Sequence, residues 1–114
     1  CRDVGLAVAE AIRASGKRVL LIASTDMSHY ISRDLAERKD RMAIEAMVAL
    51  DPERLHGTVL RERISMCGFH PTTAVLIAAK ALGASRAELV RYATSGDVTK
   101  DDSSVVGYAG LIVR

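Results

Sequence analysis

The chain has little cysteine, few aromatic residues and no long apolar run. Its two cysteines, Cys1 and Cys67, lie far apart, without the pairing of a zinc site or the density of a disulfide framework, so we expect a reducing, cytoplasmic setting. Aromatic residues make up 4% of the chain, which leaves no aromatic platform for nucleic-acid bases. The longest apolar runs, residues 19–23 and 74–79, are far shorter than a bilayer requires, so we expect no membrane segment.

Charge is also balanced rather than concentrated. The net charge is +2, and acids alternate with bases, as in residues 36–41, so the sequence does not predict nucleic-acid binding. With 114 residues, 49% of them hydrophobic, the chain has the size of one globular domain, residues 1–114. It begins with Cys1 rather than methionine, so we expect it to be the C-terminal part of a longer polypeptide.

Hydrophobic periodicity predicts alternating helices and strands. The expected helices cover residues 4–15, 35–50, a segment beginning with Asp51 as N-cap and Pro52 at its first position, and residues 71–82. The expected strands are residues 18–24, 89–94 and 105–113, of which the first resembles a central strand buried on both faces. We predict an α/β fold with helices packed on a mostly parallel or mixed sheet, which the missing N-terminal portion completes.

Two short segments hold almost every side chain that could carry chemistry. Ser24–Tyr30 directly follows the first expected strand and contains Asp26 and His29, and Met66–Pro71 contains Cys67 directly before a helix. Because the ends of parallel strands gather on one side of a sheet, we expect these three side chains to surround one cavity.

Each of these residues also has a purely structural interpretation. Cys67 precedes a helix start, where backbone amides favour a thiolate that could bind a soft metal or act as a nucleophile, or it is simply a small buried residue. His29 is either an acid/base group whose tautomer a carboxylate fixes, or a surface histidine beside a helix-capping Asp26. His70 could join Cys67 as a ligand or cap the next helix, and we expect His56 to be a solvent-facing helical residue.

Four segments taken together resemble a known family. They are Val19–Tyr30, Cys67–Pro71, Tyr92–Asp97 and Ser104–Ala109. In this order and at these separations they resemble the C-terminal part of a Memo-family protein, also called AmmeMemoRadiSam system protein B. That family is similar in fold to the class III, LigB-type extradiol dioxygenases, which are non-haem iron enzymes.

The resemblance implies a redox or dioxygenase-like metal site. Its ligands would be Cys67, two histidines from the missing N-terminal half and, in this chain, also His29; Asp26 would line the same pocket and His29 would act as acid/base over an unidentified small-molecule or peptide substrate. Iron(II) is the expected metal and copper the alternative, with none held tightly by this part alone. Two other functions stay open: a non-catalytic peptide- or metal-binding module, and a metal-free hydrolase or transferase using Cys67 and His29. The oligomeric state is also open.

Overall fold

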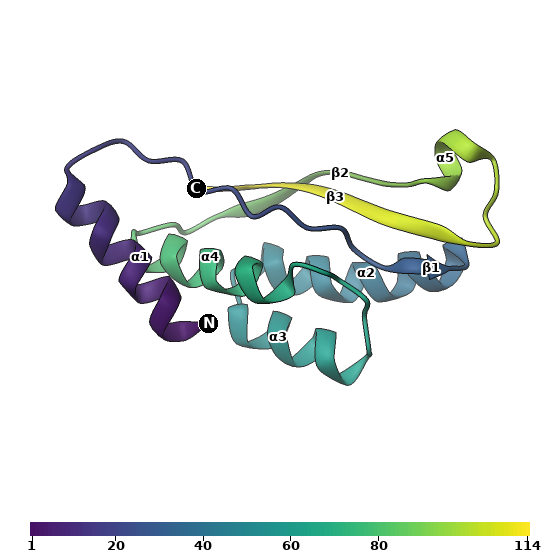
Figure 1. Ribbon diagram of the computed structural model, residues 1–114, viewed down its shortest axis with the longest axis horizontal. Helices are drawn as coiled ribbons and strands as arrows, with labels where there is room; N and C mark the ends of the chain where they lie inside the picture. Colours follow the sequence, from purple (N-terminus) through teal and green to yellow (C-terminus); the bar gives the residue numbers. More distant parts are fainter.

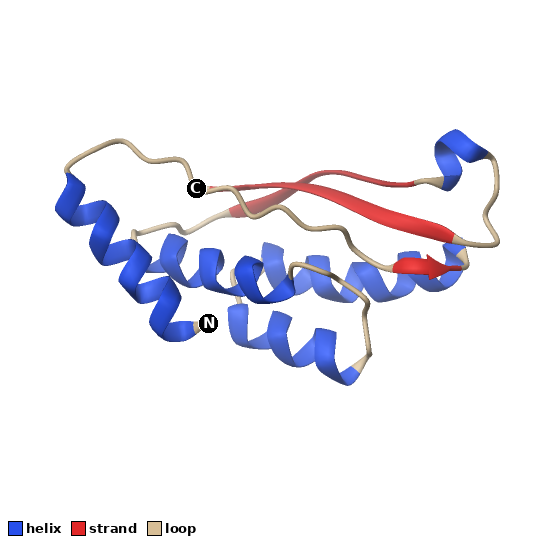
Figure 2. Cartoon of the chain, in the orientation of Figure 1, coloured by secondary structure: helices blue, strands red, loops and turns tan.

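The computed structural model describes all of residues 1–114 as five helices and three strands (Figures 1 and 2). In chain order, the elements are α1 Arg2–Ser15, β1 His29–Ile31, α2 Arg33–Val48, α3 Pro52–Arg61, α4 Phe69–Ala81, β2 Ala87–Thr94, α5 Gly96–Thr99 and β3 Val105–Val113. Helices α2, α3 and α4 lie on one side of the β2–β3 ribbon, and α1 crosses α4 near one end of the molecule (Figure 1). The predicted α/β class is therefore confirmed.

All strand pairings are antiparallel. The strand order is β1-β3-β2, and β2 and β3 form a long hairpin in which Ala87 pairs with Val113 and Thr94 with Gly107. The predicted number of strands is confirmed, and the sheet that we expected to be mostly parallel or mixed is antiparallel throughout these three strands. Because β2 and β3 are consecutive and joined by a short connection through α5, they pair in the antiparallel direction as the two strands of a hairpin.

The segment predicted as the central strand has no partner in the sheet. Residues 18–24 form no strand, and Leu20 and Ile22 are 83% and 77% exposed. The third strand is instead β1, which starts at His29, five residues after the end of the predicted strand. A strand is defined by backbone pairing, which apolar composition alone does not supply. Figure 2 shows this stretch as a loop running from α1 to β1.

The helix boundaries follow the expected signals closely. Helix α1 ends at Gly16, and the side chain of Asp51 accepts a hydrogen bond from Arg54 N at 2.9 Å at the start of α3. Helix α4 begins at Phe69, two residues earlier than predicted, because a proline in the first helical turn loses no backbone hydrogen bond. None of the helices has both the length and the hydropathy that crossing a bilayer demands.

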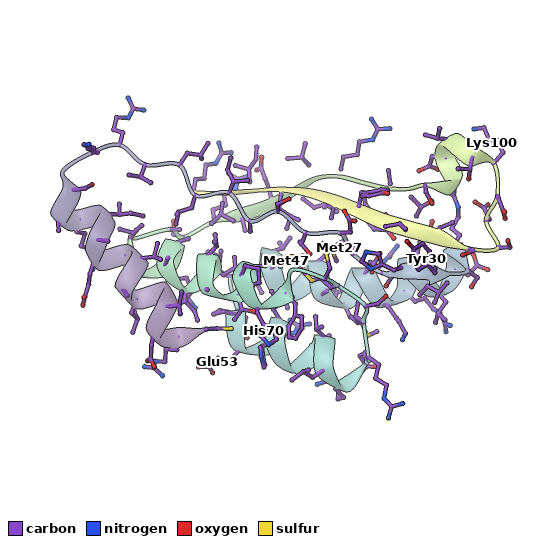
Figure 3. All side chains as sticks on the ribbon, in the orientation of Figure 1. Met27, Tyr30, Met47, Glu53, His70 and Lys100 are labelled. Atoms are coloured by element: carbon purple, nitrogen blue, oxygen red, sulfur yellow. The ribbon has the colours of Figure 1, made fainter.

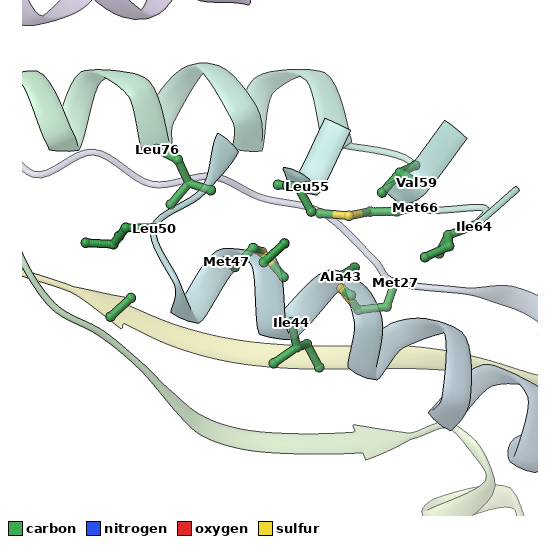
Figure 4. Close-up of a cluster of buried hydrophobic side chains, with 12 residues drawn as sticks. Met27, Ala43, Ile44, Met47, Leu50, Leu55, Val59, Ile64, Met66 and Leu76 are labelled. Carbon is green, nitrogen blue, oxygen red and sulfur yellow. The ribbon is translucent and has the colours of Figure 1, made fainter. Parts of the chain in front are cut away.

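The core lies between the helices and the hairpin (Figure 4). Its buried residues are Met27, Ala43, Ile44, Ala46, Met47, Leu50, Leu55, Val59, Ile64, Met66, Leu76 and Ala87. Leu55 and Val59 of α3 face this core, and Met47 of α2 packs within it. Met27 is 1% exposed, so the segment between Asp26 and His29 is pinned to the core by a side chain whose burial stabilises it by roughly 1.5–3 kcal/mol.

A polar network is buried beside this core. Asp40 of α2 is fully buried, and one of its oxygens accepts hydrogen bonds from Ser28 N at 2.9 Å and Ser28 Oγ at 2.6 Å. Its other oxygen accepts from Tyr92 OH at 2.7 Å. Burial, and then the hydrogen bond to Asp40, raise the pKa of Tyr92, so the phenol keeps the proton that it donates. Leaving a buried polar group without one of its hydrogen-bond partners typically costs about 1–3 kcal/mol.

Candidate metal centre

Asp26, His29 and Cys67 come together although they belong to two distant segments. One ligand atom from each residue lies within 4.8 Å of the others. His29 Nε2 is 3.6 Å from Asp26 Oδ2, and the two side chains are 21% and 48% exposed. These three side chains do not line either of the two main hollows of the chain. The structure thus brings together the residues singled out from the sequence, and the shared cavity stays a prediction.

The segment carrying Asp26 and His29 is held on both sides of its buried Met27. Met27 N donates to Gly107 O, and Gly107 N donates to Ser28 O, each at 2.9 Å. The pairing register then shifts between His29 and Ile31, which leaves Tyr30 as a bulge with a φ of 57°. Bulges of this kind redirect neighbouring side chains and often lie next to functional sites. No helix begins at Asp26, so its interpretation as a helix cap is wrong.

Ser65 fixes the orientation of the His29 ring. His29 N donates to Ser65 Oγ at 2.7 Å, and His29 Nδ1 lies 2.5 Å from the carbonyl oxygen of Ser65. Because a carbonyl can only accept, Nδ1 must carry the proton of this hydrogen bond. In the neutral ring the lone pair is therefore on Nε2, the nitrogen facing Asp26. Metal-binding histidines are commonly oriented in this way.

The sulfur of Cys67 is exposed and receives a backbone hydrogen bond. Asp26 N donates to Cys67 Sγ at 3.3 Å, and Thr25 Oγ1 lies 3.6 Å from the same sulfur. The interpretation of Cys67 as a small buried residue is therefore wrong. The N–H of Asp26 and the hydroxyl of Thr25 therefore hold in place the sulfur atom that would bind a metal or act as a nucleophile.

A close contact between Thr25 and Gly68 joins the two segments. Gly68 N donates to Thr25 Oγ1 at 2.7 Å. A Cβ atom at position 68 would lie 2.6 Å from Thr25 Cβ and 2.9 Å from the carbonyl oxygen of Ser24. Since part of this obstacle is backbone, only glycine allows the segments to approach so closely.

We therefore expect Gly68→Ala to separate the sulfur from the other donors. The added methyl group must displace the Ser24–Thr25 backbone, and small misplacements of ligands are costly, so the affinity of the centre for iron(II) should fall about tenfold. Gly57→Ala is the matched control, because a Cβ there meets no atom within 4 Å and alanine favours helix α3. Calorimetric iron(II) titration of both variants measures the difference. Equal affinities would show that the close contact is unimportant.

The other two histidines lie elsewhere. His70 stacks on Phe69 with ring centroids 3.9 Å apart, and its ring centroid is 5.4 Å from that of His56. His70 is on the α3–α4 side of the molecule, whereas Tyr30 marks the β1 end (Figure 3). His70 is not among the donors that gather at Cys67, and the N-cap of α4 is Gly68. His56 is partly buried rather than solvent-facing.

Sequence reasoning missed the residues that support the centre. Ser65 fixes the His29 ring and Thr25 contacts Cys67, yet neither was singled out from the sequence. Thr25 lies inside the segment we recognised, and Ser65 directly precedes the other. Their proximity in sequence to candidate ligands was the available signal, since partners of ligands are often close neighbours.

The donor set suits a transition metal. A thiolate, an imidazole nitrogen and a carboxylate oxygen bind Fe(II), Zn(II) or Cu far better than hard cations such as Ca(II). In a tetrahedral site, nitrogen and oxygen ligands are roughly 3.5 Å apart. The 3.6 Å separation of His29 Nε2 and Asp26 Oδ2 matches this distance. Without a cation or a proton, the lone pair of Nε2 would face the carboxylate, an unfavourable arrangement.

The fold and the centre define an α/β chain with a mixed sulfur, nitrogen and oxygen donor cluster. Residues 1–112 match the sequence profile of the family described as Memo-like protein. This chain belongs to the Memo-like protein family.

Curated relatives support the assignment and are much longer. The chain is 50% identical over 109 residues to a MEMO1 family protein of Methanothermobacter thermautotrophicus, covering 96% of this chain and 39% of that protein. It is 47% identical over 113 residues to a MEMO1 family protein of Methanopyrus kandleri, covering 99% and 40%. A MEMO1 family protein of Methanococcoides burtonii is 47% identical over 112 residues, covering 98% and 42%. The chain thus spans about two fifths of the length of these relatives.

Proposed function

We propose that this chain supplies part of a non-haem metal site in a Memo-like protein, with iron(II) as the metal and copper as the alternative. The observation that carries the proposal is the convergence of Cys67, His29 and Asp26 within 4.8 Å. A bound iron(II) would supply the electron-transfer and dioxygen chemistry that protein side chains lack. The site would serve a redox reaction on a small molecule or peptide.

Each residue has a distinct role in this proposal. Cys67 binds the metal through its sulfur, and the N–H of Asp26 helps to hold that atom in position. His29 presents Nε2 either to the metal or to the substrate as an acid/base group, because Ser65 occupies Nδ1. Asp26 lines the same site, and its Oδ2 lies 3.6 Å from Nε2, where it faces the proton that Nε2 carries when His29 acts as an acid.

The remaining ligands would come from outside residues 1–114. An open catalytic site usually has three protein ligands, and here Cys67 and His29 are the two we assign. The chain spans about two fifths of its relatives, so the rest of the family sequence is available to supply the expected histidines. With those residues added, we propose a fold similar to that of the LigB-type extradiol dioxygenases. A thiolate in place of a hard carboxylate would shift both the metal preference and the potential.

The exposed sulfur favours a second function without a metal. Cys67 is accessible, accepts an N–H bond and lies within 4.8 Å of the histidine nitrogen. A cysteine, a histidine and a group that orients the histidine, here the Ser65 carbonyl on Nδ1, are the parts of a cysteine hydrolase or acyltransferase. A metal- or peptide-binding module without turnover would use the same residues. In each case the thiol must stay reduced, which is consistent with the cytoplasmic location that we propose.

Alkylation of Cys67 separates these functions. In the full-length protein, meaning the polypeptide of family length that contains residues 1–114, iron(II) should slow the reaction of Cys67 with iodoacetamide about tenfold, because a ligated thiolate is a poor nucleophile. Cys1 is also exposed and serves as the internal control. Peptide mass spectrometry at timed intervals, under anaerobic conditions, follows both residues in one sample.

The outcomes are distinct. Protection of Cys67 alone supports the metal site, and oxygen consumption by the iron-loaded protein with candidate substrates then distinguishes an enzyme from a binding module. Equal alkylation of Cys67 with and without iron(II) or copper would contradict the metal proposal. A fast metal-independent reaction, with loss of nucleophilicity in His29→Ala, would instead support the cysteine dyad.

A further inference from the structure

We infer that Asp40 is a positioning residue, which fixes the backbone of the Asp26–His29 segment through its hydrogen bonds with Ser28. Its importance for metal binding rests on the proposed function, but its effect on the geometry of His29 does not. Nothing in the local sequence marks Asp40 as special, because it lies within an alternating run of charged residues. In the structure it is the one fully buried carboxylate.

The hydrogen bonds of Asp40 lead directly to the candidate site. One of its oxygens accepts both the N–H and the hydroxyl of Ser28, at 2.9 and 2.6 Å. Ser28 is itself fully buried and immediately precedes His29. Because Ser28 N donates to Asp40, while its carbonyl accepts from Gly107 N, both polar groups of its backbone are held. The backbone therefore has little freedom at the residue that introduces the histidine.

The surroundings of Asp40 are shaped for a carboxylate. A Cβ atom at position 107 would collide with the second oxygen of Asp40, so glycine there leaves room for the charge beneath β3. Tyr92 donates to the same oxygen at 2.7 Å from β2. The carboxylate thus joins α2, the hairpin and the site segment. A buried charge with three donors is a more directional anchor than apolar packing, which tolerates sliding.

The hydrogen bonds of Asp40 to Ser28 and to Tyr92 predict different effects on the candidate site. Ser28 connects Asp40 to the site, whereas Tyr92 connects it to β2, away from the three donors. Removing either hydroxyl deletes one hydrogen bond to the same buried anion. A purely structural role predicts similar effects on stability and no difference at the site. A positioning role predicts that only the Ser28 side changes the geometry of His29.

The experiment compares Ser28→Ala with Tyr92→Phe in the full-length protein. Nitrogen-15 NMR of the histidine rings, without metal, reports whether Nδ1 of His29 keeps its proton and its hydrogen bond to Ser65. We expect the His29 signals to shift or broaden in Ser28→Ala and to stay as in the wild type in Tyr92→Phe. Iron(II) affinity should fall about tenfold in Ser28→Ala and stay within about twofold in Tyr92→Phe. Asp40→Leu, which is similar in shape, should exceed Ser28→Ala in both readouts if it folds.

Each result decides one claim. Unchanged His29 signals in Ser28→Ala, or equal changes in Ser28→Ala and Tyr92→Phe, would overturn the positioning role. If the wild-type protein binds no iron or copper, the proposed metal function fails, but the NMR comparison still tests Asp40. The two proposals can therefore fail separately.

Discussion

Replacing Cys67 by serine should lower the affinity of the full-length protein for iron(II) by at least about tenfold, and copper binding should weaken similarly. Serine is nearly isosteric but offers a neutral hydroxyl in place of an anionic, soft sulfur ligand. The fold should tolerate the change, because Cys67 is exposed and a serine oxygen can still accept from Asp26 N. Elemental analysis and titration at matched protein concentration measure the loss.

His56→Ala is the control for this substitution. His56 packs against Phe69 and His70 and is not among the donors at the candidate centre, so its replacement should leave metal content unchanged. Equal metal content in the wild type and Cys67→Ser would exclude the sulfur as a ligand. Metal loss in His56→Ala equal to that in Cys67→Ser would indicate general destabilisation of the fold instead.

The isolated 114-residue chain should self-associate and should bind iron(II) only weakly. A groove of about 650 Å³ is lined by 20 residues, of which 16 are hydrophobic, and one wall of it is the unpaired segment 19–23. An exposed apolar surface of this kind commonly marks an interface. We propose that the remainder of the family sequence covers it, because the relatives are about two and a half times as long as this chain.

Lysine substitutions distinguish association through this groove from non-specific aggregation. Leu20→Lys combined with Ile22→Lys should shift the isolated chain toward monomer in size-exclusion chromatography coupled to light scattering. Val98→Lys is the control, because Val98 is 85% exposed on α5 and does not line the groove. In the full-length protein the double variant should be strongly destabilised, since each buried leucine or isoleucine contributes about 1.5–3 kcal/mol.

A monomeric chain that binds iron(II) stoichiometrically and tightly would contradict this prediction. It would show that residues 1–114 form a complete unit and that the groove needs no cover. Tolerance of the double lysine variant by the full-length protein would likewise place segment 19–23 at a solvated surface there.

Local signals in the sequence determined most of the helices. The start of α3 at Asp51–Pro52 and the helical spacing of apolar residues depend on interactions within a few positions. The hairpin strands were also predicted, because β2 and β3 carry β-branched residues on either side of a polar connection. The boundaries of β2 and α4 differ from prediction by only two residues.

The convergence of Asp26, His29 and Cys67 was predicted for a reason that the structure does not support. We expected it because parallel strand ends gather at one edge, yet the strands are antiparallel. The segments are joined by the hydrogen bond from Gly68 N to Thr25 Oγ1 and by the hydrogen bond from His29 N to Ser65 Oγ. The types of chemical groups could be recognised from sequence, but the contacts joining them span about 40 residues.

The sequence by itself thus determined the elements with local causes and the identity of the candidate donors. Only the tertiary structure decided that residues 18–24 have no pairing partner and that β1 is the third strand of the sheet. It also decided that Asp40 is buried, although the residues next to it in the sequence are charged. Strand pairing and the burial of a single carboxylate depend on which distant groups lie opposite, such as Gly107 and Tyr92 for Asp40. Such partners leave no periodic signal in the sequence, because their free energy comes from contacts between residues far apart in the chain.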